Sequence, residues 1–280
     1  KIVDCLSHGK YTSKIVRENL VWSLLLTCEH ASNEIPQNNE GWKWGDNDLK
    51  QQLPEKHWGI DLGAHDFTLD IIEALEDQNS TILKTRQMDN AHAIHGSLSA
   101  VSAQFSRLLL DCNRPLGSDT MFRKDCDGVD VDLNRNITEA EKQLRADMFF
   151  HPYHAAIDKI MEEESPKIVF SIHSFNPVYE GSKREMEVGI LFDDSSEAIG
   201  SQITKLMRDD GIKAEENQPW SGKEGFMYSA QIHAAKGKNS VPLMIEVRND
   251  ILLNEEAKRN VVNSLVKALR SPEVFPYCSV

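Results

Sequence analysis

Three short apolar runs, rich in branched side chains, each lead directly into ionisable residues. The runs span residues 22–27, 168–172 and 241–245, and they are followed by Glu29 with His30, by His173 and by Glu246. Runs of this length and composition predict buried strands of an α/β protein. Because ligands collect at the carboxyl ends of strands in an open α/β sheet, we expect these side chains to meet in one site.

The rest of the chain alternates between predicted helices and predicted strands. Further strands are expected at 81–84, 107–112 and 188–192, and helices at 61–75, 153–164, 196–209, 225–235 and 254–269. A helix begins at Thr138 with a possible capping box to Glu141, and Pro152 is expected to kink or break it. This order predicts an α/β fold with a mixed, largely parallel central sheet flanked by helices. Since no Pro/Gly/Ser-rich linker interrupts residues 1–280, we expect one domain.

Charge and cysteine content limit the possible partners and location. The net charge of −13 argues against nucleic acid but permits a small anionic substrate, because an arginine cluster or a metal can reverse the local potential. The sequence contains no apolar run long enough to span a membrane and no apolar segment typical of a signal peptide. The five cysteines form no CxxC pair, so we expect reduced thiols and a cytoplasmic location.

His30 and His173 are the predicted metal ligands. Two neutral imidazoles and a carboxylate make a hydrolytic zinc site, and a further carboxylate can serve as general base. We favour Asp61, at the start of a predicted helix, as the third ligand. Glu29 is the alternative, although adjacent strand residues point to opposite faces. One Zn2+ per chain is expected, with other divalent metals possible.

Glu246 is an acid inside an otherwise apolar strand. Burying a carboxylate there is costly unless the group is paired or functional. As a functional group it would be the general base that deprotonates a water. The structural alternative is a buried pair with Arg248, two residues further along the same face.

A second set of polar residues points to an anionic substrate. Arg107, Asp111, Asn113 and Arg114 surround one predicted strand, and Asn134-Arg135 repeats the Asn-Arg pair. Arginine binds carboxylates bidentately, so the two pairs favour a substrate with carboxylate groups. Salt bridges that stabilise loops are the alternative for both arginines. Ser174, beside His173, and Arg248 are further candidates for substrate contacts.

Several motifs occur in an order that resembles the N-formylglutamate amidohydrolase family, over roughly residues 22–269. They are CEHASN (28–33), DLGA (61–64), SRLLLDCNRP (106–115), HSF (173–175) and IEVRND (245–250). The resemblance implies a fold similar to that of the zinc carboxypeptidases. It also implies metal ligation by His30 and His173, a base role for Glu246, and a substrate carboxylate held by Arg114 or Arg135.

The reaction that this resemblance implies is hydrolysis of N-formyl-L-glutamate to formate and glutamate, in histidine degradation. Arg107 or Arg114 is expected to stabilise the oxyanion. Three alternatives stay open: a zinc hydrolase of another N-acyl amino acid or a peptide, a non-catalytic binding module, and a hydrolase that uses Cys28 or Cys112. Both cysteines end apolar runs and are more simply explained as buried small hydrophobes.

Overall fold

The computed structural model describes residues 11–36, 58–85, 96–126 and 128–279. Its main feature is a seven-stranded sheet in the order β1-β3-β2-β6-β11-β9-β10. The strands are β1 (Thr12–Leu20), β2 (Ser23–Cys28), β3 (Gly96–Ala103), β6 (Ile168–Phe175), β9 (Val188–Leu191), β10 (Ala214–Glu216) and β11 (Val241–Arg248). β3, β2, β6 and β11 are parallel neighbours, whereas β1 and β9 join antiparallel. The predicted mixed, largely parallel sheet is confirmed.

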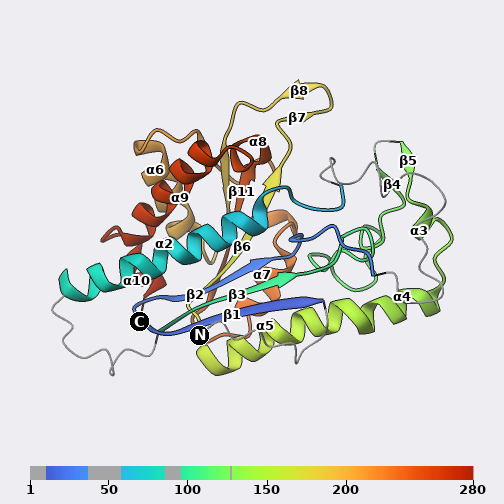
Figure 1. Ribbon diagram of the computed structural model, residues 1–280, viewed down its shortest axis with the longest axis horizontal. Coiled ribbons are helices and arrows are strands. Elements are labelled where there is room, and N and C mark those ends of the chain that lie inside the picture. Colours follow the sequence, from blue (N-terminus) through green and yellow to red (C-terminus); the bar gives the residue numbers. More distant parts are fainter. Residues whose placement is uncertain (1–10, 37–57, 86–95, 127, 280) are drawn as a thin grey trace.

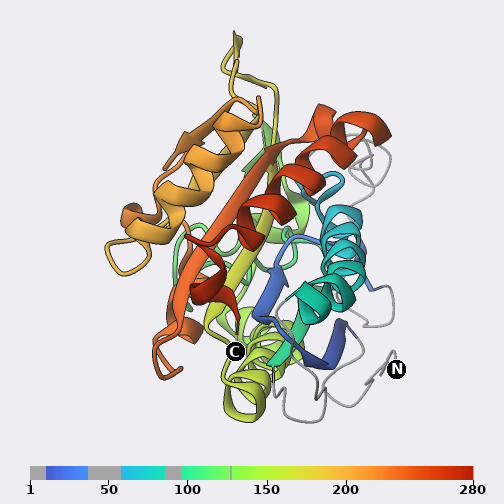
Figure 2. The same ribbon diagram turned by 90° about the vertical axis from the view of Figure 1, so that its left-hand side faces the viewer.

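Helices cover both faces of this sheet (Figure 1). The helices of the described residues are α2 (Ala64–Thr85), α3 (Asp132–Arg135), α4 (Glu139–Arg145), α5 (His151–Glu164), α6 (Glu197–Asp209), α7 (Tyr228–Ala234), α8 (Asn249–Leu252), α9 (Glu255–Arg270) and α10 (Phe275–Cys278). Two small hairpins complete the described part: β4 (Asp125–Cys126) with β5 (Val129–Asp130), and β7 (Val178–Tyr179) with β8 (Ser182–Lys183). Figure 2 shows the β7–β8 hairpin projecting from the body of the protein. No helix within the described ranges combines the length and apolarity needed to cross a membrane.

Alternate side chains of the central strands build two separate cores. Leu24 and Leu26 of β2 pack in the core formed with α2, α6 and α9. Leu25, between them, packs in the core formed with α5 and α7. This is the two-residue period of a strand buried on both faces, and it explains why these runs are apolar throughout.

The connections of β2 create a crevice at its carboxyl end. From β2 the chain passes through α2 to β3 on one side, whereas β6 pairs with β2 on the other side. Neighbouring parallel strands whose connections leave in opposite directions open a space at their carboxyl ends. His30 follows β2 and His173 lies near the end of β6, so both predicted ligands stand at this opening.

Two predicted strands are wrong. Residues 81–84 belong to α2, because a short apolar run does not distinguish a strand from the continuation of a helix. Residues 107–112 form turns whose leucines are fully buried like those of a central strand. Their carbonyls are satisfied by side chains instead of a strand ladder: Asn134 donates to Leu108 O and Arg145 to Leu109 O.

Three strands of the sheet, β1, β3 and β10, were not predicted from the sequence. β3 reads Gly-Ser-Leu-Ser-Ala-Val-Ser-Ala, a composition poor in the branched and aromatic residues that favour strands. It forms a strand because it lies between β1 and β2 and pairs with both. The predicted helix break near Pro152 is a π-helical turn, Ala146–Phe150, that joins α4 to α5. The capping box of Thr138 and Glu141 is present as predicted.

Candidate metal and active site

Four ionisable side chains come together from separate segments at the end of the sheet. The Asp61 backbone N–H donates to His30 O at 3.0 Å, which ties the residue before α2 to the residue after β2. The register of β11 against β6 places Glu246 directly beside His173. Paired residues on adjacent strands share a face, so the predicted base and one predicted ligand are neighbours.

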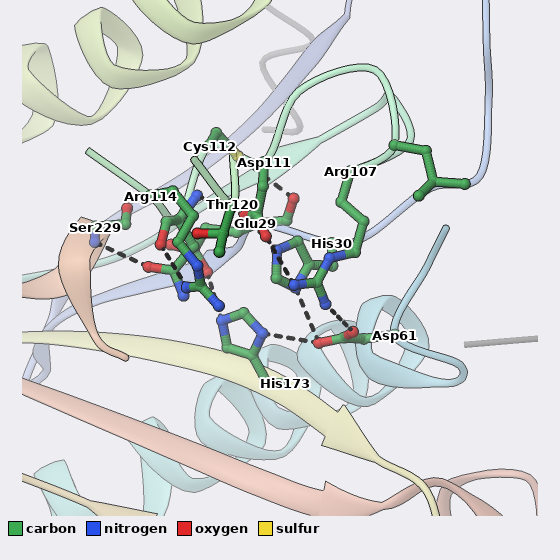
Figure 3. Close-up of polar contacts among 12 residues, drawn as sticks. Glu29, His30, Asp61, Arg107, Asp111, Cys112, Arg114, Thr120, His173 and Ser229 are labelled. Atoms are coloured by element: carbon green, nitrogen blue, oxygen red, sulfur yellow. Dashed lines mark hydrogen bonds and ion pairs between the residues drawn. The ribbon is translucent and has the colours of Figure 1, made fainter. Parts of the chain in front are cut away.

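His30, Asp61 and His173 form a compact group in which one potential ligand atom of each residue lies within 4.8 Å of the others. All three side chains are buried. The Asp61 Oδ2 atom lies 3.2 Å from Nδ1 of His30 and 2.7 Å from Nδ1 of His173 (Figure 3). Two imidazole nitrogens and a carboxylate oxygen facing one point are the donor set of a hydrolytic zinc site.

Two further carboxylates contact the opposite nitrogens of these histidines. His30 Nε2 lies 2.9 Å from Asp111 Oδ1, and His173 Nε2 lies 3.0 Å from Glu29 Oε2. A carboxylate at Nε2 keeps the proton there and leaves the Nδ1 lone pair for a metal. The Ser171 hydroxyl also donates to Glu29, at 2.6 Å. Asp61 is therefore placed among the ligand atoms, whereas Glu29, the alternative ligand, contacts the outer side of His173.

The charges around His30, Asp61 and His173 favour a bound cation. Burial alone would raise the pKa of Asp61, but His30 and His173 hold it well below its usual range. Burial opposes protonation of His173, yet its hydrogen bonds to Asp61 and Glu29 outweigh that cost and raise its pKa to about 10. Carboxylates that hold a proton on a buried imidazole offer the same position to a divalent metal. The donor set thus fits a metal ion.

Glu246 faces the same space. Its Oε2 atom is buried and has no hydrogen-bond partner among the described residues. Burial is the largest cause that raises the pKa of Glu246, to about 8, against the lowering effect of His173, Arg107 and Arg184. The alternative pair with Arg248 does not form, because Arg248 Nε donates to Asp250 at 2.8 Å. Within the described part of the chain, Glu246 is thus a proton acceptor whose Oε2 atom has no hydrogen-bond partner.

Arg107 and Ser174 hold the carboxylates around the two histidines in place. Arg107 donates to Asp111 at 2.7 Å and lies 3.4 Å from Asp61. The Ser174 backbone N–H donates to Asp61 at 3.3 Å, and its hydroxyl donates to Leu62 O at 2.9 Å. Both residues line the cavity, but these polar contacts are made to the protein.

The site opens into a cavity of about 220 Å³. Its lining includes these predicted residues: His30, Asp61, Arg107, Asn113, Arg114, His173, Ser174 and Glu246. It also includes residues that were not predicted from the sequence: Trp58, Arg123, Phe175, Asn176, Tyr179, Arg184, Trp220 and Phe226. Most of these lie on loops between elements, where no periodicity or motif signals a shared surface. A larger hollow of about 540 Å³, bordered by residues between 116 and 151, contains none of the proposed metal ligands.

Three predicted substrate-binding residues lie outside this lining. Asn134 is buried and donates to Leu108 O and Arg123 O, while its carbonyl accepts from Arg145. Arg135 is half-exposed and pairs with Asp130 and Asp132. Arg248 donates to Asp250 and to the backbone. Asn113 does line the cavity, but its amide contacts Phe226 O and Ser229 N, which attaches its loop to the region of α7.

The two cysteines considered as nucleophiles are buried. Cys28 and Cys112 are fully inaccessible, and burial raises the pKa of both thiols well above their usual range. A neutral, inaccessible thiol is a poor nucleophile. This arrangement favours the packing interpretation of both residues.

Comparison with known proteins agrees with this geometry. Residues 22–253 match the N-formylglutamate amidohydrolase family. The chain belongs to this family. Its members are hydrolases of amide bonds, so the chain is an amidohydrolase, as the motif order implied. A search of curated proteins finds no match.

Two solved structures extend the family assignment to the fold. A gene product of Agrobacterium tumefaciens is 27% identical, with a TM-score of 0.74 and 94% of each chain covered. An N-formylglutamate amidohydrolase from Ralstonia eutropha is 16% identical, with a TM-score of 0.63, 92% of this chain covered and 97% of the other. The second likeness concerns the fold alone.

Proposed function

We propose that this amidohydrolase is zinc-dependent and releases formate from N-formyl-L-glutamate, leaving L-glutamate, the reaction expected of a step in histidine degradation. The observation that carries the proposal is the shared cavity. The group His30, Asp61 and His173 lines this cavity together with several arginines and the buried Glu246, whose Oε2 atom has no hydrogen-bond partner among the described residues. A metal ligand set, a proton acceptor and cationic groups for a carboxylate are what this hydrolysis requires.

Each residue has a role that follows from its contacts. His30, Asp61 and His173 would hold the zinc ion, which when bound polarises the amide carbonyl and acidifies the attacking water. Glu246 would accept the proton from that water at Oε2 and pass it to the leaving amine nitrogen. Arg107 pairs with both Asp61 and Asp111, and it holds the pKa of Asp111 well below its usual range against the raising effect of burial.

Metal content and turnover together test the proposal. We expect about one zinc per chain, since one ligand set of three residues is present among the described residues. Formate should be released from N-formyl-L-glutamate, should stop after dialysis against a chelator, and should return on adding zinc. If the metal-bound protein hydrolyses only other N-acyl amino acids, the proposed substrate is wrong and the metal-dependent amide hydrolysis is retained. A metal-free protein that chelators do not inhibit would overturn zinc dependence.

Zinc binding should release protons at neutral pH. In the metal-free protein the pKa of His173 is about 10 and that of Glu246 about 8, so both groups are protonated at pH 7. A metal held by His173 would displace a proton from its imidazole, and the added positive charge would lower the pKa of Glu246. About one to two protons should leave per zinc, and affinity should rise as pH increases from 7 toward 10.

Calorimetric titration of the metal-free protein with zinc, in buffers of different ionisation enthalpy, measures this proton release. Zinc affinity that does not change between pH 6 and 8 would contradict the assigned protonation states. The matched variant Glu246→Gln should release fewer protons than the wild type, because only the His173 site then contributes.

A further inference from the structure

Three arginines line the cavity without a carboxylate partner among the described residues: Arg114, Arg123 and Arg184. Arg107, on the same wall as Asp111, is by contrast paired with two carboxylates. The unpaired arginines are not fully exposed, so part of their hydration is already lost. Arginines that are concentrated in a cavity and not paired with a carboxylate create a positive potential that an anionic ligand can neutralise.

Aromatic rings hold each of these guanidinium groups. The Arg114 guanidinium carbon lies 5.7 Å from the Phe226 ring centroid, and that of Arg123 lies 4.7 Å from Trp58. Arg184 contacts three rings, with distances of 5.2 Å to Phe175, 4.8 Å to Tyr179 and 5.4 Å to Trp220. Stacking uses the face of a guanidinium and leaves its N–H edge for a carboxylate.

The three arginines come from two segments of the chain and contact separate rings. Arg114 and Arg123 lie on the connection between β3 and β4, whereas Arg184 follows β8. Phe226 holds Arg114 and Trp58 holds Arg123, whereas Phe175, Tyr179 and Trp220 hold Arg184. Burial is the largest cause that lowers the pKa of both Arg123 and Arg184, so neither cation is fully compensated.

The backbone that carries Arg184 is fixed by another arginine. Arg248 donates to the carbonyl oxygens of Arg184 at 3.0 Å and Met186 at 3.2 Å, while pairing with Asp250. Arg184 itself donates to Asn176 O at 3.3 Å and directly follows the β7–β8 hairpin. A cation held by three rings and a braced backbone is pre-organised, which lowers the entropy cost of binding a ligand.

We propose that Arg184 is the specificity-determining residue for a second carboxylate of the substrate, bound apart from a first carboxylate at Arg114 and Arg123. The inference rests on the proposed function and extends it. The cavity selects N-acyl amino acids with two separated anionic groups over those with a neutral side chain. Arg248, predicted from the sequence as a substrate contact, acts in this arrangement by positioning the Arg184 backbone.

The test compares two substrates that differ only in side-chain charge, N-formyl-L-glutamate and N-formyl-L-glutamine. Arg184→Met keeps an unbranched side chain to pack on the rings but removes the cation. It should lower kcat/KM for the glutamate substrate by about 10- to 150-fold, the range for a lost charge-assisted hydrogen bond. The value for the glutamine substrate should change by less than about threefold. Arg208→Met, at an exposed pair on α6, is the matched control and should change neither value.

A fall of the same factor for both substrates, or no fall for either, would overturn the assignment. Calorimetric titration with glutarate and with butyrate gives a second readout that needs no turnover. Wild type should bind glutarate more tightly than butyrate, and Arg184→Met should lose that difference. If wild type hydrolyses neither substrate, the proposed function fails, and the titration still decides the role of Arg184. Equal Kd values for glutarate in wild type and Arg184→Met, or no binding by either protein, would refute the proposed role of Arg184 in binding a carboxylate.

Discussion

Glu246→Gln should lower kcat for formate release by about 10²- to 10⁴-fold, the usual contribution of general acid–base catalysis, and leave zinc content unchanged. The amide fills the same volume but cannot accept a proton. Glu246 makes no hydrogen bond through Oε2 within the described part of the chain, so its replacement removes no structural contact at that atom. The measurement is steady-state formate release together with metal analysis.

A control separates this catalytic effect from a general loss of structure. Glu197→Gln changes an exposed carboxylate on α6 and should retain wild-type turnover. Thermal unfolding should show Glu246→Gln to be at least as stable as the wild type at neutral pH, because the variant no longer contains a buried, unpartnered carboxyl group. Turnover by Glu246→Gln within about tenfold of wild type would refute the base role.

Asp61→Ala should weaken zinc binding more than Glu29→Gln does. Asp61 is the carboxylate that faces Nδ1 of both histidines, so its loss removes one ligand of three. Glu29 contacts only the outer Nε2 of His173, and replacement of such an outer partner costs about 10- to 100-fold in metal affinity. We expect the Asp61 variant to exceed that range and to purify without stoichiometric zinc.

This pair of variants decides between the two candidate third ligands. The measurement is the zinc dissociation constant, by competition with a chromophoric chelator, with circular dichroism to establish that each variant is folded. The reverse order of affinities would make Glu29 the ligand and Asp61 the outer residue. In the Glu29→Gln variant, the Ser171 hydroxyl should still donate one hydrogen bond to the uncharged amide, so this variant is a fair comparison.

The fold was predictable wherever the apolar pattern within a single strand or helix is enough to identify that element. β2, β6 and β11 are apolar on both faces because helices cover both, and α6 and α9 carry apolar faces at the helical period. β3 was not predictable, since serine, glycine and alanine carry little strand preference and the pairing partners supply the structure. The leucines at 108–110 led to the wrong prediction of a strand. They are buried as in a central strand, but the backbone there forms turns, so burial alone does not identify a strand.

The candidate site shows the same division. The positions of His30, His173 and Glu246 at the ends of apolar runs are enough to indicate hydrolytic chemistry. Asn134 and Arg135 repeat the sequence pair of Asn113 and Arg114, yet Asn134 bonds to buried backbone and Arg135 to surface aspartates. The sequence of an Asn-Arg pair gives the two side chains, but it does not determine whether the loop that carries them faces the cavity.

The sequence by itself determined a strand-end cluster of two histidines and acids, and so the hydrolytic chemistry of the chain, because strand composition and the position of polar residues are local properties. Only the tertiary structure placed Asp61 between the imidazoles and Glu29 behind one of them, since that choice depends on how the chain before α2 returns to β2. It also gathered Arg114 and Arg123, from the connection between β3 and β4, and Arg184, from the segment after β8, around one cavity. Distances between loops follow from packing of the whole domain and leave no periodic trace in the sequence.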